Sequence, residues 1–259
     1  MKKFNFSKYQ GTGNDFVMVD NRKSIIDIND VHLIGRICDR RFGIGSDGLI
    51  LIEDHLQYDF RMIYINPDGT QSLCGNGSRC AVMFANELGL IKNDTTFLSI
   101  EGPLHAMIRG KNVHLKMPDV DGIKTTTKKD LFINTGSPHY IRFVKDVQNL
   151  DVDKTGRTIR NSKEFKPEGT NVNFVEQEGE KEIFVRTFER GVECETLSCG
   201  TGVTASALAI GREMKNGTIN IRTLGGKLAV EFEQVDKEKF ENIYLIGPAE
   251  KVFDGKIEI

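Results

Sequence analysis

The sequence contains one segment that occurs twice. Residues 73–80 read LCGNGSRC and residues 198–205 read SCGTGVTA, so Cys199 follows Cys74 by 125 positions. Each cysteine stands directly before Gly-x-Gly, and an apolar run follows. Two weaker matches keep the same order: 11–20 with 134–143 at a spacing of 123, and 45–53 with 170–178 at 125. Because solenoid repeats have periods of only ~20–50 residues, the pattern predicts a duplicated domain.

The length of 259 residues suits two domains of about 130 residues. We expect residues 1–120 with 248–259 to form the domain that carries Cys74. Residues 121–247 should then form the domain that carries Cys199. Both domains are long enough to bury a core without disulfides or metal ions.

Strand signals dominate both halves, so the expected fold class is α+β. Short β-branched or aromatic runs are separated by Gly, Asn or Asp; they lie at 16–20, 49–53, 60–65, 95–100, 105–109 and 113–117, and again at 131–136, 140–144, 172–177, 182–188, 218–222, 227–232 and 242–247. Three helices are expected, at 31–41 with Asp30 or Asn29 as N-cap, at 78–88 and at 202–214. The last two are apolar almost all round, which indicates buried helices. Each half should therefore be a β-barrel-like sheet around a central helix, with the active site in the cleft between the halves.

Charge and cysteine content narrow the possible partners. A net charge of −2 gives no basic surplus for nucleic acid or an anionic membrane, and no apolar stretch approaches the ~20 residues of a membrane span. A small-molecule partner is expected. The N-terminus lacks the apolar core of a signal peptide. Five cysteines cannot all pair, which indicates a reducing cytoplasm.

Two common explanations of such motifs do not fit. Zinc sites use Cys-x2–4-Cys pairs, usually two of them or one with a His pair. Five residues separate Cys74 from Cys80 and four separate Cys194 from Cys199, and no His pair completes a site, so no metal is expected. Residues 43–48, GIGSDG, match Gly-x-Gly-x-x-Gly, but a helix precedes them and a strand follows. That order is the reverse of a dinucleotide-binding fingerprint, so the segment is interpreted as a turn.

The position of Cys74 and Cys199 points to acid–base chemistry, whereas burial explains Cys38, Cys80 and Cys194. A helix N-terminus presents unpaired amides and about half a positive charge. It binds carboxylates and can lower a cysteine pKa from ~8.5 into the range ~3.5–7.5. Two equivalent acid–base groups suit inversion of a stereocentre, because one removes a proton and the other returns one.

At these residues the chain resembles the diaminopimelate epimerases. The matching motifs run through the whole sequence in order: GTGNDF at 11–16, GIGSDG at 43–48, NPDGT at 66–70, CGNGSRC at 74–80, TGSPH at 135–139, GTN at 169–171, ERG at 189–191 and ETLSCGTG at 195–202. The resemblance implies interconversion of LL- and meso-diaminopimelate without pyridoxal phosphate, metal or other cofactor, for lysine and cell-wall synthesis. It also implies a homodimer.

Site roles follow from the resemblance, motif by motif. Cys74 and Cys199 would be the catalytic acid–base pair, with Cys199 taking the proton in the LL-to-meso direction. Four residues would hold the reacting carboxylate through their backbone amides: Gly75, Asn76, Gly200 and Thr201. Five others would bind the substrate through their side chains: Asn14, Asn66, Asn171, Glu189 and Arg190. His139 and Glu189 would tune the pKa of the cysteines.

Departures and alternatives remain open. Some family members carry Gln at the position of Gly48, and Asn at that of Ser137, and one residue more separates ERG from ET here than in some members. A proline or hydroxyproline racemase on the same fold is an alternative, and an acid-dependent isomerase of the phenazine type is disfavoured by the two cysteines. A non-catalytic amino-acid-binding or redox-sensing protein is the alternative outside enzymes.

Overall fold

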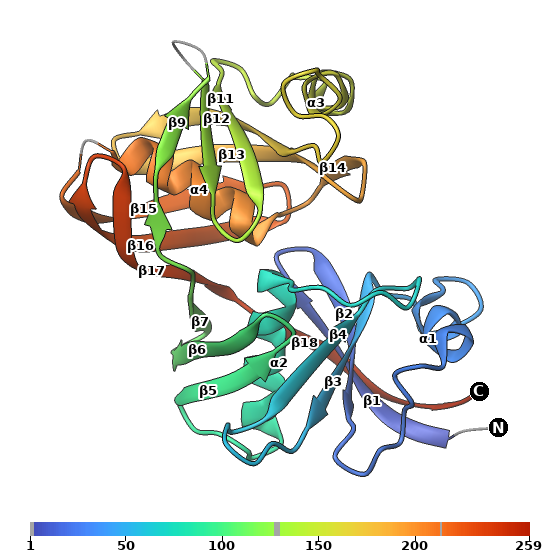
Figure 1. The fold of residues 1–259 in the computed structure, drawn as a ribbon. Helices are drawn as coiled ribbons and strands as arrows, with labels where there is room; N and C mark the ends of the chain where they lie inside the picture. Colours follow the sequence, from blue (N-terminus) through green and yellow to red (C-terminus); the bar gives the residue numbers. More distant parts are fainter. Residues whose placement is uncertain (1–2, 127–129, 213) are drawn as a thin grey trace. The chain divides into compact units, whose positions relative to one another are not determined.

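The computed structural model describes residues 3–126, 130–212 and 214–259 (Figure 1). The chain divides into two compact units. The first comprises Met1–Leu115 with Gly247–Ile259, and the second comprises Lys116–Ile246. Each unit is described by itself.

The first unit is a mixed sheet with two helices. Its strands are β1 (Lys3–Gly11), β2 (Asn14–Asp20), β3 (Gly48–Glu53), β4 (Arg61–Ile65), β5 (Asp94–Ser99), β6 (Gly102–Arg109), β7 (Asn112–Lys116) and β18 (Glu250–Glu258). Helix α1 (Val31–Cys38) follows β2, and α2 (Gly75–Glu87) follows β4. Strands β2 and β3 pair in parallel, as do β4 and β5, whereas β1–β2, β3–β4, β5–β6 and β6–β7 are antiparallel.

The second unit repeats this order. Its strands are β8 (Val120–Asp121), β9 (Ile123–Thr125), β10 (Asp130–Asn134), β11 (Pro138–Phe143), β12 (Asn171–Gly179), β13 (Glu182–Glu189), β14 (Cys194–Thr196), β15 (Asn216–Thr223), β16 (Gly226–Asp236) and β17 (Lys239–Pro248). Helix α3 (Val152–Arg160) corresponds to α1, and α4 (Gly200–Gly211) corresponds to α2. The parallel pairs are β11–β12 and β13–β15, the counterparts of β2–β3 and β4–β5. The predicted duplicated α+β fold is confirmed.

Helices α2 and α4 are the buried helices of their units, as predicted. Helix α2 packs against β1, β2, β3, β4 and β6, and α4 packs against β10, β11, β12, β13, β15 and β16. Almost every residue from Asn76 to Ala85 and from Gly200 to Ala209 is buried. Both helices begin earlier than predicted, at the glycine that follows the cysteine, so Cys74 and Cys199 are the N-caps.

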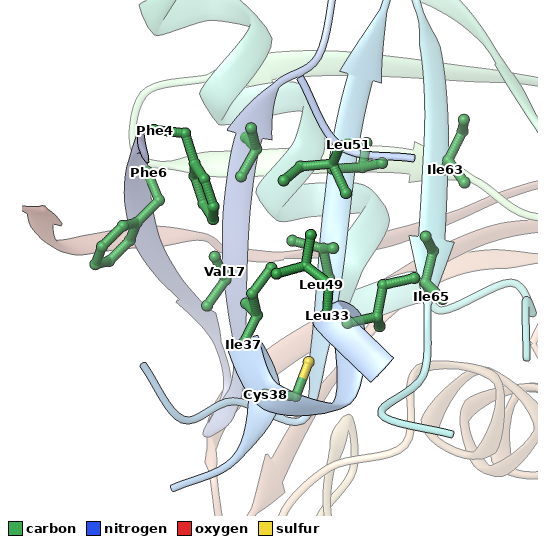
Figure 2. Close-up of a cluster of buried hydrophobic side chains, with 13 residues drawn as sticks. Phe4, Phe6, Val17, Leu33, Ile37, Cys38, Leu49, Leu51, Ile63 and Ile65 are labelled. Carbon is green, nitrogen blue, oxygen red and sulfur yellow. The ribbon is translucent and has the colours of Figure 1, made fainter. Parts of the chain in front are cut away.

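The second helix of each unit, α1 or α3, packs against the opposite face of the sheet. In the first unit, Val17, Leu49 and Ile65 of the sheet pack against Leu33 and Ile37 of α1 (Figure 2). Helix α1 ends at Cys38, three residues before the predicted end, and Asp30 is its N-cap. Because residues alternate along each strand, Phe16 and Met18 of β2 face away from this cluster.

Helix α3 was not predicted. It contains mostly polar residues, and only Val152 and Gly156 are buried, so its apolar periodicity is weak. Gly156 lies directly against the Phe188 ring, where any Cβ atom would collide. A glycine inside a helix normally lowers helix propensity, but here it allows the helix to approach β13 closely.

The strand pairings correct one of the internal matches. Phe16 pairs with Gly48, and His139 pairs with Asn171. Ile50 pairs with Tyr64, and Asn173 with Thr187. One spacing of 123 positions therefore relates all four positions, including the segment 45–53 that the sequence alone matched at 125. The spacing becomes 125 only at the central helices, because the connection that contains β14 is longer in the second unit.

Candidate active site

In the first unit, Cys74 stands at the start of α2 with both a donor and an acceptor nearby. Its Sγ accepts a hydrogen bond from the Gly77 amide at 3.4 Å. Its Sγ also lies 3.4 Å from Asn14 Oδ1. Asn76 Nδ2 donates to the same Asn14 oxygen at 3.4 Å. The structure thus brings together Cys74, Asn76 and Asn14, three of the predicted site residues.

The orientation of the Asn14 amide determines what it can offer Cys74. Asn14 Nδ2 donates to Asp47 Oδ2 at 2.6 Å, and an ionised carboxylate only accepts. Asn14 Oδ1 therefore faces the thiol and can only accept, so the contact at Cys74 is made with the protonated S–H form. Arg40 holds Asp47 through an ion pair of 2.7 Å.

A network of charged side chains next to Asn14 holds the hairpin of β1 and β2 in position. Asp15 accepts from Arg40 at 2.6 Å and pairs with Lys8 at 2.7 Å. Burial acts to raise the pKa of Asp15, but hydrogen bonds from Arg40 and Lys8 outweigh it and hold the pKa at about 2. The carboxylate is therefore ionised throughout the neutral range, and the turn between β1 and β2 keeps its position.

Arg79 lies one turn further along α2 and is fully buried. Its Nη2 donates to Thr12 Oγ1 at 3.3 Å and its Nε to the Pro248 carbonyl at 3.4 Å. In the described part of the chain, no carboxylate contributes to its electrostatic environment and Nη1 has no hydrogen-bond partner. Burial lowers the pKa of Arg79, while the Cys80 and Cys74 thiols act in the opposite direction. A buried cation therefore lies in the electrostatic environment of Cys74.

In the second unit, Cys199 is buried at the start of α4. Its Sγ lies 3.6 Å from Thr201 Oγ1. Gly202 lies against both Cys199 Sγ and Asn173 Oδ1, so that a Cβ atom at Gly202 would collide with the Asn173 amide. The Asn173 side chain is therefore packed directly against the first turn of α4.

Asn173 belongs to a buried chain of three polar side chains. Thr187 Oγ1 donates to Asn173 Oδ1 at 2.9 Å. Asn173 Nδ2 lies 3.1 Å from His139 Nδ1 and donates to the Tyr140 carbonyl at 3.2 Å. Burial, with a smaller contribution from the Arg190 charge, lowers the pKa of His139 to about 3. The imidazole is therefore neutral at physiological pH.

The remaining predicted residues have local partners. Asn171 Nδ2 donates to the Pro138 carbonyl at 3.1 Å, and its Oδ1 accepts from the Arg190 amide at 2.8 Å. Glu189 Oε2 accepts from Thr196 Oγ1 at 2.9 Å. Asn66 donates within its own loop to Thr70 and Ser72. Asn171 thus joins two backbone segments next to His139 and Arg190.

Two further interpretations of the sequence concern the other three cysteines and Gly48. Burial is confirmed for Cys38 and Cys80, whose pKa values it raises, but Cys194 is exposed and the prediction of burial there is wrong. Cys194 begins β14, a three-residue strand that pairs with β13. At Gly48, a Cβ atom would collide with the Tyr64 ring, so a larger residue would need that ring to move.

Sequence reasoning missed Arg79, Asn173 and Thr187. The signal was present for the last two. A polar residue on the face of a strand that looks toward a buried helix is unusual, and their counterparts at the spacing of 123 are the apolar Ile50 and the aromatic Tyr64. The corrected register is what makes this comparison visible.

Several solved structures share this fold. A phenazine biosynthesis protein of the PhzF family from Bacillus anthracis matches with a TM-score of 0.79 at 18% identity, covering 100% of both chains. A hydroxyproline epimerase from Agrobacterium vitis, solved with trans-4-hydroxy-L-proline, matches with a TM-score of 0.67 at 15% identity, covering 99% of this chain and 92% of that one. At these identities the likeness concerns the fold.

The sequence comparisons define the family. The family model for diaminopimelate epimerase matches residues 6–120 and 131–252. A diaminopimelate epimerase of Flavobacterium psychrophilum is 49% identical over 254 residues, covering 96% of this chain and 98% of the relative. One from Aquifex aeolicus is 40% identical over 274 residues, covering 97% of each. The chain belongs to the diaminopimelate epimerase family and is an isomerase. Within the described ranges, no helix is long and apolar enough to cross a membrane.

Proposed function

We propose that the protein epimerises LL-2,6-diaminopimelate to meso-diaminopimelate with Cys74 and Cys199 as its two acid–base residues. One observation carries the proposal: a cysteine is the N-cap residue of the buried helix in each unit of a duplicated fold. A helix start stabilises thiolate and carboxylate alike. The thiols would act on opposite faces of one α-carbon.

In the LL-to-meso direction the Cys199 thiolate takes the α-proton, and the electron pair left on carbon is delocalised into the adjacent carboxylate. The Cys74 thiol then gives its proton to the other face of the same carbon. The contact with Asn14 supports this assignment, because Asn14 Oδ1 accepts from the protonated form of Cys74. After turnover the protonation states of the two thiols are exchanged, which suits the reverse reaction.

The other predicted residues would bind the substrate. The amides of Gly75, Asn76, Gly200 and Thr201 would hold the reacting carboxylate, since one well-placed donor aimed at developing negative charge is worth ~2.7–4 kcal/mol. The distal amino-acid group would be bound by polar side chains that include Asn14, Asn66, Asn171, Glu189 and Arg190. Arg190 suits a carboxylate because its planar guanidinium can pair through two hydrogen bonds. His139 and Glu189 would tune the thiols.

Membership of the family also supports a proposal for the compartment, the oligomeric state and the pathway. We propose a cytoplasmic homodimer that needs no cofactor and serves lysine and peptidoglycan precursor synthesis. The exposed thiol of Cys194 fits a reducing compartment.

The test is incubation with LL-diaminopimelate in D2O under reducing conditions. The wild-type protein should form the meso isomer with deuterium at the α-carbon. Cys74→Ala and Cys199→Ala should each lower the rate by at least the ~10²–10⁴-fold typical of an acid–base group. Cys38→Ala is the matched control, because Cys38 is buried but lies away from a helix start.

Three other outcomes would each contradict a part of the proposal. Turnover of proline or hydroxyproline in place of diaminopimelate would contradict the substrate assignment. Full activity in either cysteine variant would contradict the two-thiol mechanism. A protein that binds diaminopimelate without exchanging its α-proton would be a binding protein.

A further inference from the structure

The buried chain Thr187–Asn173–His139 has a defined hydrogen-bond direction. The Tyr140 carbonyl can only accept, so the atom of Asn173 that faces it, at 3.2 Å, must be the amide nitrogen. Asn173 Oδ1 therefore faces Thr187, which donates to it at 2.9 Å. The side-chain amide is fixed at both ends and has no freedom to flip.

This direction determines which ring nitrogen of His139 carries the proton. The second N–H of Asn173 Nδ2 points to His139 Nδ1 at 3.1 Å, so Nδ1 must accept. A neutral imidazole that accepts at Nδ1 carries its proton at Nε2. Full burial of the ring keeps it neutral. The ring is thus a hydrogen-bond donor through Nε2 and has no lone pair left to act as a base.

The Nε2 atom has no hydrogen-bond partner among the described residues, although it is buried. A buried donor without a partner is costly to keep, which points to an anionic partner during the reaction. This hydrogen-bonded network lies at the first turn of α4, because Asn173 Oδ1 packs against Gly202, which in turn contacts Cys199 Sγ. Negative charge that forms there belongs to a thiolate or to a substrate carboxylate.

We propose that Thr187 and Asn173 are positioning residues that hold His139 as the Nε2–H tautomer, so that it serves the reaction as a neutral hydrogen-bond donor. This inference deepens the proposed function and rests on it for the reaction served. The arrangement belongs to the second unit alone, since the matching positions of the first unit are Phe16, Ile50 and Tyr64.

The direct test is the nitrogen NMR spectrum of the full-length protein labelled with ¹⁵N-histidine, with His139→Gln to assign the His139 signals. The wild-type ring should show a protonated Nε2 and an unprotonated Nδ1. Asn173→Asp replaces the donor to Nδ1 with a carboxylate, so the proton should appear at Nδ1. A wild-type ring protonated at Nδ1, or an unchanged tautomer in Asn173→Asp, would overturn the inference.

Activity supplies the second readout. The wrong tautomer in a catalytic triad costs ~10⁴-fold in kcat, so Asn173→Asp should lower kcat by about 10²–10⁴-fold. Thr187→Val should lower kcat by about tenfold, as loss of an outer hydrogen bond does elsewhere, and Thr187→Ser should restore it. Thr95→Val is the matched control, because Thr95 is an equally buried threonine whose hydroxyl donates to Asp59.

The two proposals can fail separately. If the wild-type ring shows the Nε2–H tautomer but the protein does not epimerise diaminopimelate, the proposed function is overturned and the assignment of the tautomer stands. If epimerisation is normal in Asn173→Asp and Thr187→Val, the positioning role is overturned and the proposed function stands.

Discussion

The two helix starts share a backbone and differ in what surrounds them. At α2, the sheet presents Phe16, Ile50 and Tyr64, and the helix itself carries the buried Arg79. At α4, the three sheet positions carry hydrogen-bonded polar residues and the position of Arg79 is taken by Thr204. Duplication has therefore kept the geometry that places a thiol at a helix start, while the groups that govern charge have diverged.

The two thiols therefore have unlike surroundings. At Cys74 the Arg79 cation favours the thiolate and the Asn14 oxygen favours the protonated form, whereas the neutral network of His139, Asn173 and Thr187 lies next to Cys199. Symmetric backbones thus carry asymmetric electrostatics. Three changes test how far the asymmetry extends, beginning with the largest expected effect.

The pH dependence of stability should come from the second unit. In the unfolded chain His139 binds a proton near pH 6.5, but in the folded chain only near pH 3. Between these values the unfolded state binds more protons, so stability rises with pH. Between pH 7.5 and 5 the free energy of unfolding should fall by about 2 kcal/mol, with the slope approaching ~1.4 kcal/mol per pH unit at the lower end.

Denaturant titrations of the wild type and His139→Gln at pH 7.5, 6 and 5 measure this contribution. The variant should lose that part of the slope. His32→Gln, at an exposed histidine, should retain it. Equal slopes in the wild type and His139→Gln would show that burial of this ring is not coupled to folding.

The third residue of each helix should respond differently to an added methyl group. Gly202→Ala forces the Asn173 amide out of its hydrogen bonds and should destabilise the protein by about 1.5 kcal/mol, within the usual range for overpacking. Gly77→Ala meets Ile50 Cδ1 at 3.0 Å, the end of a flexible side chain. The gain of ~1 kcal/mol in helix propensity should offset that contact.

Thermal unfolding of the two variants beside the wild type checks this prediction. Equal destabilisation would mean that the polar chain is no more rigid than the apolar packing at the same place in the first unit.

The smallest effect is expected from the buried cation. Arg79→Met removes a positive charge from the environment of Cys74 and should slow its alkylation by iodoacetamide at pH 7 about fivefold, because a nearby cation favours thiolate. Arg79→Lys should retain most of the rate. The rate is measured by mass spectrometry of the peptide that contains Cys74.

Thr204→Val, at the matching position of α4, is the control and should leave the Cys74 rate unchanged. An unchanged rate in Arg79→Met would mean that the helix start, without the side chain, sets the reactivity of the thiol.

Much of the architecture follows from local sequence. Apolar alternation located thirteen strands, and the Cys-Gly segments located both buried helices. Helix α3 escaped detection because its stability comes from close packing of Gly156 on β13 and from few apolar residues. Strands β1 and β18 were not expected; they pair with each other across almost the whole sequence, and β1 also pairs with its neighbour β2.

The motif residues of the candidate site could be predicted from the sequence, but the residues that orient them could not. The cysteines, Asn14 and His139 stand in recognisable motifs, whose pattern is local. The residues that orient these side chains do not belong to such motifs. Asn173 acts through contacts with residues on two other strands, and Asp47 reaches Asn14 from just before the start of β3, the parallel neighbour of β2. Such contacts depend on register, and a shift of two residues in the internal alignment concealed them.

The pairing of β1 with β18 joins Lys3 to Glu258 and so closes almost the whole chain into one loop. Residues 116–246 form a contiguous unit, which the ribosome synthesises before residues 247–259 of the first unit. The N-terminal unit, although its first residues are made first, receives its final strand last. The order of synthesis and the order of completion are therefore reversed between the two units, and until β18 has been synthesised β1 has an edge with no strand beside it.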